Sequence, residues 1–190
     1  LSDLFCLRNL GLICLGVLAS STAWAFEPND VPNDFRGTFV NCMAKGEADP
    51  VAGKEYAGQW LGSDAGGEAF AYFCLAVYTY RTGEPERAAE LLESLAEHSD
   101  VRETDYRLRF VSFAGDLFDA AGDYEAAFRA YSKALDVTRF EPRLWVDRAL
   151  ARAALGDFEG TIEDLNLALA LDADNVEALV FRGSSYLAVD

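Results

Sequence analysis

The sequence contains few residues whose types and spacing could support catalysis or metal binding. Its single histidine, His98, stands near the end of a helical stretch, where a favourable interaction with the helix terminus explains it. The pair Asp172-x-Asp174 begins like a calcium-binding loop but lacks the later glycine and glutamate. The glycine-rich segment 62–67 has no preceding strand and no following lysine, so it fits a turn between helices better than a phosphate-binding loop. No serine lies in a nucleophile elbow and no carboxylate pair stands apart, so we predict no enzymatic activity, no cofactor and no metal site.

The composition supports a folded chain with an acidic surface. Hydrophobic residues make up 51% of the 190 residues, which is enough for a continuous core. The formal net charge of −16 argues against binding to nucleic acid, whose phosphates require a basic surface, and equally against anionic lipid. An acidic surface favours neutral or basic partners, although acids that only solvate the outer helix faces would give the same charge balance.

The first 25 residues have the pattern of a secretory signal peptide rather than part of a fold. Arg8 supplies positive charge, 10–19 is a short apolar run, and Ala23-Trp24-Ala25 is a small-x-small cleavage signal before Phe26. The apolar run has about ten residues, whereas a membrane-spanning helix needs roughly 20. We therefore expect cleavage after Ala25, the alternative being an uncleaved anchor, and export of the mature chain to a bacterial periplasm. Residues 26–33, with two prolines, are interpreted as a linker.

Two blocks of equal length, 108–141 and 142–175, carry the same pattern of small and large residues. Thirty-four residues separate Gly115 from Ala149, Gly122-Asp123-Tyr124 from Gly156-Asp157-Phe158, and Tyr131 from Leu165. A fixed period of this length is the signature of an array of helix pairs. The sequence therefore predicts an all-α protein.

Weaker versions of the repeat precede and follow these blocks. One spans about 69–102 and is followed by extra residues near 99–105, which we assign to a longer loop. A degenerate first repeat covers 34–66: a helix over 34–45 that Gly46 terminates, then a second helix with Asp49 as N-cap and Pro50 in its first turn. A partial repeat covers 176–190. Because the chain starts with Leu1 rather than Met and stops inside this repeat, we expect further chain to follow.

The repeats resemble the tetratricopeptide repeat (TPR) of exported bacterial proteins, strongly over 67–190 and weakly over 34–66. Small residues stand where paired helices cross, and large ones fill the gap to the next repeat; these are Ala76, Gly115, Ala149 and Gly183, and Leu92, Tyr131 and Leu165. The second helices depart from the family pattern in having Thr161 and Leu95 where alanine is usual and no terminal proline. The resemblance implies a right-handed superhelical solenoid of antiparallel helix pairs with a concave groove lined by the first helix of each pair.

By the same resemblance, the groove would bind a peptide or protein partner. The implied partner-binding residues are Phe73, Val77, Tyr80, Arg109, Ser112, Asp116, Arg143 and Val146, with Asp119 and Leu150 beside them. The lysines and asparagines that hold a C-terminal carboxylate in one TPR subset are absent at these positions, so chaperone-tail binding is not expected. Arg109 and Arg143 could contact an acidic peptide, or they could neutralise Asp116 and other acids nearby. Phe73 and Tyr80 could anchor the partner, or they could be buried against the first repeat.

Two cysteines remain after signal cleavage, Cys42 and Cys74. They are 32 residues apart, close to one repeat, so both should fall on the first helices of adjacent pairs. Facing cysteines on packed helices can meet disulfide geometry, and we predict a structural bridge, the alternative being two buried thiols.

We conclude from the sequence that this is a non-catalytic protein-interaction scaffold of the cell envelope. Two alternatives stay open. The chain could be the N-terminal adaptor region of a longer envelope-assembly protein or enzyme. It could also self-associate through its last helix. The sequence does not identify the partner.

Overall fold

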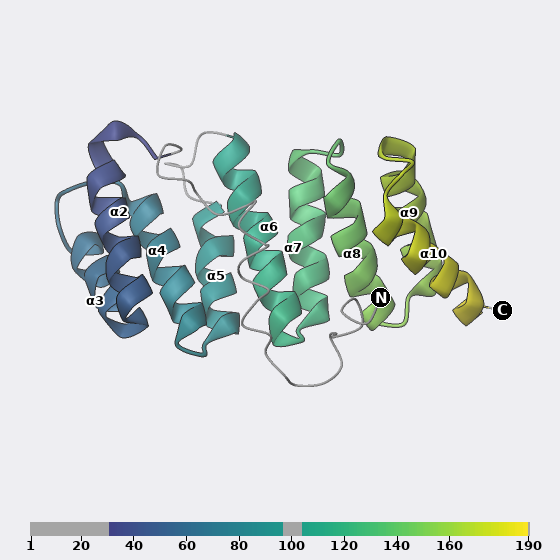
Figure 1. Ribbon diagram of the computed structural model, residues 1–190, viewed down its shortest axis with the longest axis horizontal. Coiled ribbons are helices and arrows are strands. Elements are labelled where there is room, and N and C mark those ends of the chain that lie inside the picture. The colour runs from purple at the N-terminus through teal and green to yellow at the C-terminus, as the bar shows by residue number, and fades with distance from the viewer. Residues whose placement is uncertain (1–30, 97–103, 190) are drawn as a thin grey trace.

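The computed structural model describes residues 31–96 and 104–189, and these residues form nine α-helices (Figure 1). The helices are α2 (Asn33–Ala48), α3 (Pro50–Leu61), α4 (Glu68–Arg81), α5 (Pro85–Ala96), α6 (Thr104–Ala121), α7 (Tyr124–Val137), α8 (Pro142–Ala154), α9 (Phe158–Leu171) and α10 (Val176–Val189). No strand occurs in these two ranges. The proposed signal peptide, most of the linker, and His98 lie outside the described residues.

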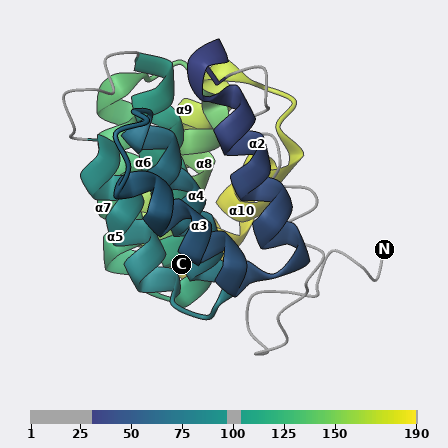
Figure 2. The same ribbon diagram turned by 90° about the vertical axis from the view of Figure 1, so that its left-hand side faces the viewer.

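The helices stack in chain order into an all-α repeat solenoid, as predicted (Figure 1). Each helix packs against the one before it, and α2 and α10 also pack on α4 and α8, respectively, first helix against first helix. Viewed from the end, α5 and α7 lie toward one edge of the array and α2 and α10 toward the other (Figure 2). First and second helices alternate along the stack, and we call the accessible side chains of the first helices α4, α6 and α8 the groove surface.

The turns within the pairs explain the repeated Gly-Asp-aromatic motif. Gly122 and Gly156 both have a φ of +82°, a conformation that glycine adopts without steric cost. The next residue, Asp123 or Asp157, caps the following helix by accepting a hydrogen bond of 3.0 Å from the backbone N–H of Ala126 or Gly160. The motif thus ends one helix and starts the next at the same position in each repeat.

The first helix pair is joined to the array by the predicted disulfide. Cys42 on α2 and Cys74 on α4 are bonded, with a Cα–Cα distance of 6.5 Å, and both are fully buried. The helix start at Pro50 is also as predicted, because the Asp49 side chain accepts a hydrogen bond from Val51 N–H.

The prediction that Gly46 ends the preceding helix is wrong. Helix α2 continues to Ala48, and Gly46 lies buried within it. The ring of Tyr78 from α4 occupies the space where a side chain on Gly46 or Gly53 would lie, and its hydroxyl donates a hydrogen bond of 2.6 Å to the Met43 carbonyl. Gly46 is therefore needed for the close packing of α2, α3 and α4 rather than for chain reversal.

Candidate protein-binding surface

The expected groove residues divide into buried and accessible groups. Phe73, Ser112 and Val146 are only 2–3% exposed, so we withdraw them from the partner-binding set. Leu150 is also buried. Val77, Tyr80, Arg109, Asp116, Asp119 and Arg143 are half-buried and keep part of their side chains at the surface.

Phe73 is buried because the first helices pack on one another. Its ring lies 6.2 Å from that of Phe39 on α2 and 6.1 Å from that of Phe110 on α6, centroid to centroid. The aromatic residue expected as a partner anchor thus belongs to a row of rings that joins three consecutive first helices. Burial, the alternative considered for Phe73, is confirmed.

A polar cluster crosses the groove surface from α6 to α8. The Tyr131 hydroxyl of α7 donates a hydrogen bond of 2.9 Å to Asp116 Oδ1. Arg143 Nη2 lies 3.5 Å from Asp116 Oδ2, and its Nε donates a hydrogen bond of 3.3 Å to Asp147 Oδ2. The Arg143 side chain is 38% exposed, so this pairing is accessible to water and contributes little to stability by itself. Of the two interpretations given for Arg143, the structure shows the second: its guanidinium pairs with the neighbouring acids Asp116 and Asp147.

The cluster is acidic around the Tyr131 hydroxyl. Burial raises the pKa of Tyr131 well above its usual value near 10, and the negative charges of Asp116, Asp147 and Asp119 raise it further. Three carboxylates therefore lie close enough to act on one buried phenol, and Arg143 pairs with two of them. The phenol stays neutral and acts as a hydrogen-bond donor at ordinary pH.

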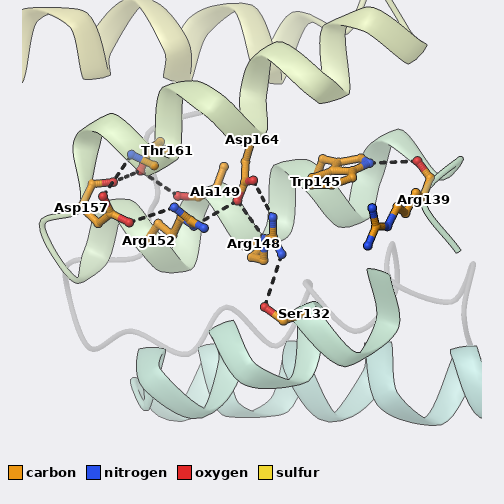
Figure 3. Close-up of polar contacts among 10 residues, drawn as sticks. Ser132, Arg139, Trp145, Arg148, Ala149, Arg152, Asp157, Thr161 and Asp164 are labelled. Atoms are coloured by element: carbon orange, nitrogen blue, oxygen red, sulfur yellow. Dashed lines mark hydrogen bonds and ion pairs between the residues drawn. The ribbon is translucent and has the colours of Figure 1, made fainter. Parts of the chain in front are cut away.

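A buried ionic group that the sequence analysis did not predict joins α8 to α9 (Figure 3). Arg148 contacts Asp164 through two hydrogen bonds of 2.9 and 2.7 Å, and Arg152 Nε lies 3.2 Å from the same carboxylate without hydrogen-bond geometry. The Arg148 guanidinium also lies 4.9 Å from the centre of the Trp145 ring. The sequence pattern that could have predicted this group is an aspartate within the apolar stripe of α9, Asp164, together with two arginines four residues apart on α8, Arg148 and Arg152. Because Asp164 is only 3% exposed, the group is structural.

The acidic motif Asp172-x-Asp174 lies between two helices. Asp172 accepts a hydrogen bond of 3.3 Å from Asp174 N–H, which makes this motif a turn between α9 and α10. In the ranges 31–96 and 104–189, no three or more His, Cys, Asp or Glu side chains are grouped so that they could hold a metal ion. Among the helices that the structure describes, none is both long enough and apolar enough to span a bilayer.

Comparisons with known proteins agree with the fold. The chain superimposes on the solved structure of MamA AMB-1 with a TM-score of 0.63 and 17% identity, covering 82% of this chain and 80% of that one. For MamA MSR-1 the TM-score is 0.61, with 17% identity and coverage of 82% and 84%. RNA polymerase II-associated protein 3 of Rattus norvegicus is 29% identical over 97 residues, which are 51% of this chain but 15% of that protein. No family model matches the sequence. The likenesses to the two solved structures show the fold, an all-α helical repeat solenoid, and the 34-residue period of this chain agrees with it.

Proposed function

We propose that this chain is a non-catalytic scaffold of the cell envelope that binds a peptide or protein partner on its groove surface. The observation that carries the proposal is that Val77, Tyr80, Asp116 and Arg143 remain accessible along the first helices of three successive pairs. A row of partly exposed side chains on a rigid stack suits an extended or helical segment that contacts several repeats at once.

The charge of the groove surface favours a basic segment over the acidic peptide considered first. The negative charges of Asp116, Asp119 and Asp147 all raise the pKa of Tyr131, and Arg143 is already paired with two of these carboxylates. A lysine or arginine of the partner would improve this balance, whereas a carboxylate would increase the repulsion. The net charge of −16 acts in the same direction at longer range and would make association dependent on salt.

Partner capture with matched variants tests the use of this surface. Protein captured from envelope extract should be identified, and its binding then measured against Tyr80→Ala and Asp119→Lys. The matched controls are Tyr124→Ala and Glu125→Lys, which make the same changes on the second helix α7. We expect the first two variants to lose affinity and the controls to retain it. If the groove variants and the α7 controls change the affinity equally while all remain folded by circular dichroism, the partner does not bind at the groove surface.

The envelope location rests on residues 1–25 and has its own test. When the full sequence is expressed in a Gram-negative host, osmotic shock should release a protein whose intact mass corresponds to a chain beginning at Phe26. Protein that retains residues 1–25, or that stays in the cytoplasm, would contradict export while leaving the groove proposal to its separate test.

A further inference from the structure

Helices α2, α3 and α4 together enclose the bridge between Cys42 and Cys74. Both cysteines are fully buried, and Ala57 of α3 and Tyr78 of α4 are buried in the same cluster. The Gly53 carbonyl oxygen of α3 lies 3.8 Å from Cys42 Sγ. While the three helices stay packed, neither sulfur atom can be reached by another molecule.

Disulfide chemistry requires such access. A disulfide forms or breaks when a thiolate attacks one sulfur atom of a disulfide, which gives a mixed disulfide that a second thiolate resolves. In forming the bridge, the two cysteine thiols lose two electrons and two protons, and the disulfide of the oxidant takes them up to become two thiols. The mixed disulfide joins a cysteine of this chain to a sulfur atom of another molecule, a contact that the packed helices exclude. Exchange therefore requires at least one of the three helices to move.

The first helix pair is the part that can move as a unit. Helices α2 and α3 pack on each other and on α4, at one end of the described array (Figure 1). Helix α4 is also held from its other side by α5, which in turn packs on α6. A unit at the end of a repeat stack has one neighbouring unit instead of two, so it opens more easily than the units inside. Within the described residues, α2 and α3 are in that position.

The contacts between this pair and α4 break together when the pair moves. The Tyr78 hydroxyl donates its hydrogen bond of 2.6 Å to the Met43 carbonyl of α2. The ring of Phe39 on α2 lies 6.1 Å from that of Phe70 and 6.2 Å from that of Phe73, both on α4, centroid to centroid. Movement of the pair therefore exposes the bridge and the apolar side of α4 at the same time.

We propose that the Cys42–Cys74 bridge forms and breaks only in a state in which α2 and α3 have moved together away from α4. The first helix pair is then a redox-controlled part of the fold: the closed bridge holds it on α4, and the open dithiol allows it to leave. The reactant is a disulfide-containing oxidant, which acts on the chain before this pair packs. The proposal concerns the fold and does not depend on partner binding at the groove surface.

Two other routes to the bridge make different predictions. A reductant that attacks the packed bridge directly would react at a rate that does not depend on how firmly α2 is held on α4. A reductant that acts only after the whole chain has unfolded would react faster whenever any part of the array is destabilised. Opening of the first pair alone predicts a rate that is sensitive to the contacts between α2 and α4 and not to contacts within the later repeats.

Matched hydroxyl deletions distinguish these routes. The purified chain is treated with N-ethylmaleimide to block other thiols and then reduced with dithiothreitol at concentrations where the rate is proportional to the reductant. Peptides containing Cys42 and Cys74 are quantified after alkylation with iodoacetamide. Tyr78→Phe removes the hydrogen bond to α2 but keeps the ring, so we expect about fivefold faster reduction. Tyr131→Phe is the matched control, since it removes a hydroxyl hydrogen bond of 2.9 Å to Asp116 in a later repeat, and the rate should not change.

Urea provides a second measurement, on the unaltered chain. Below the unfolding transition, urea should accelerate reduction with a slope smaller than that of global unfolding, because only the surface of the first pair becomes exposed. Faster reduction of Tyr78→Phe but not of Tyr131→Phe, together with this smaller slope, supports the proposal. Equal rates for Tyr78→Phe and the unaltered chain, equal acceleration of both variants, a rate that urea leaves unchanged, or a slope equal to that of global unfolding overturns it.

Discussion

Replacement of Cys42 and Cys74 by alanine is expected to lower the free energy of unfolding by at least about 3.7 kcal/mol. The bridge closes a loop with a sequence separation of 32 residues. In the chain-entropy model such a loop removes about 12.4 cal/mol/K from the unfolded chain, or about 3.7 kcal/mol at 25 °C. Both cysteines are 0% exposed, so loss of packing adds to this value. The two single alanine variants, measured under reducing conditions, isolate the packing contribution.

The loss should be concentrated at one end of the array. The bridge joins α2 to α4, and in a repeat stack each pair is stabilised by its neighbours. We therefore expect amide hydrogen exchange to rise first in α2 and α3 and little in α8 to α10. Urea unfolding followed by circular dichroism, with and without reductant, gives the free energy. An unchanged urea midpoint on reduction, or faster exchange spread evenly over the array, would refute the reasoning.

Three further predictions follow from single side chains. Gly115→Ala should destabilise the fold by about 1–3 kcal/mol in urea unfolding because its Cβ would overlap the Tyr131 ring, whereas Gly183→Ala should stabilise it by up to about 1 kcal/mol. Equal effects of the two would contradict the packing described. Asp164→Asn should cost about 3–5 kcal/mol because two arginines would lose their carboxylate, and a loss below about 1 kcal/mol would show that the group is not buried as described. The pKa of Tyr131 is raised in the folded state, so its protonated hydroxyl contributes fully to folding stability below the unfolded pKa near 10. This contribution is lost as the pH rises through the folded-state pKa. Tyr131→Phe should therefore reduce the loss of stability measured between about pH 9 and pH 12.

The helix pairs could be predicted because each turn repeats a local chemical requirement. Gly122-Asp123 and Gly156-Asp157 supply a positive φ and an N-cap at the same offset, which short-range physics alone determines. The Gly46 prediction failed because the same residue type serves two purposes. A glycine near the end of a helix can reverse the chain, or it can admit a ring from a distant helix, and only the position of Tyr78 distinguishes them.

The groove surface was harder to predict because periodicity gives the face of a helix but not what covers that face. Phe73, Ser112 and Val146 were assigned to the same groove as Asp116 and Arg143, yet neighbouring helices bury the first three. Residue type would have predicted part of the exposure, since the charged residues of the groove remain partly exposed. Residue type would give the wrong answer for Asp164, which is buried because two arginines compensate for the burial of its charge.

The contact between Arg148 and Asp164 has a consequence for how the chain folds. Repeats of similar shape can stack with the wrong neighbour, and apolar contacts discriminate weakly between the alternatives. If α7 took the place of α9 against α8, Arg148 would face Ala130, the residue 34 positions before Asp164, and a buried charge would lose its partner. The ion pair thus favours the native pairing of α9 with α8 over pairing of α7 in its place, because only the native pairing gives Arg148 a carboxylate.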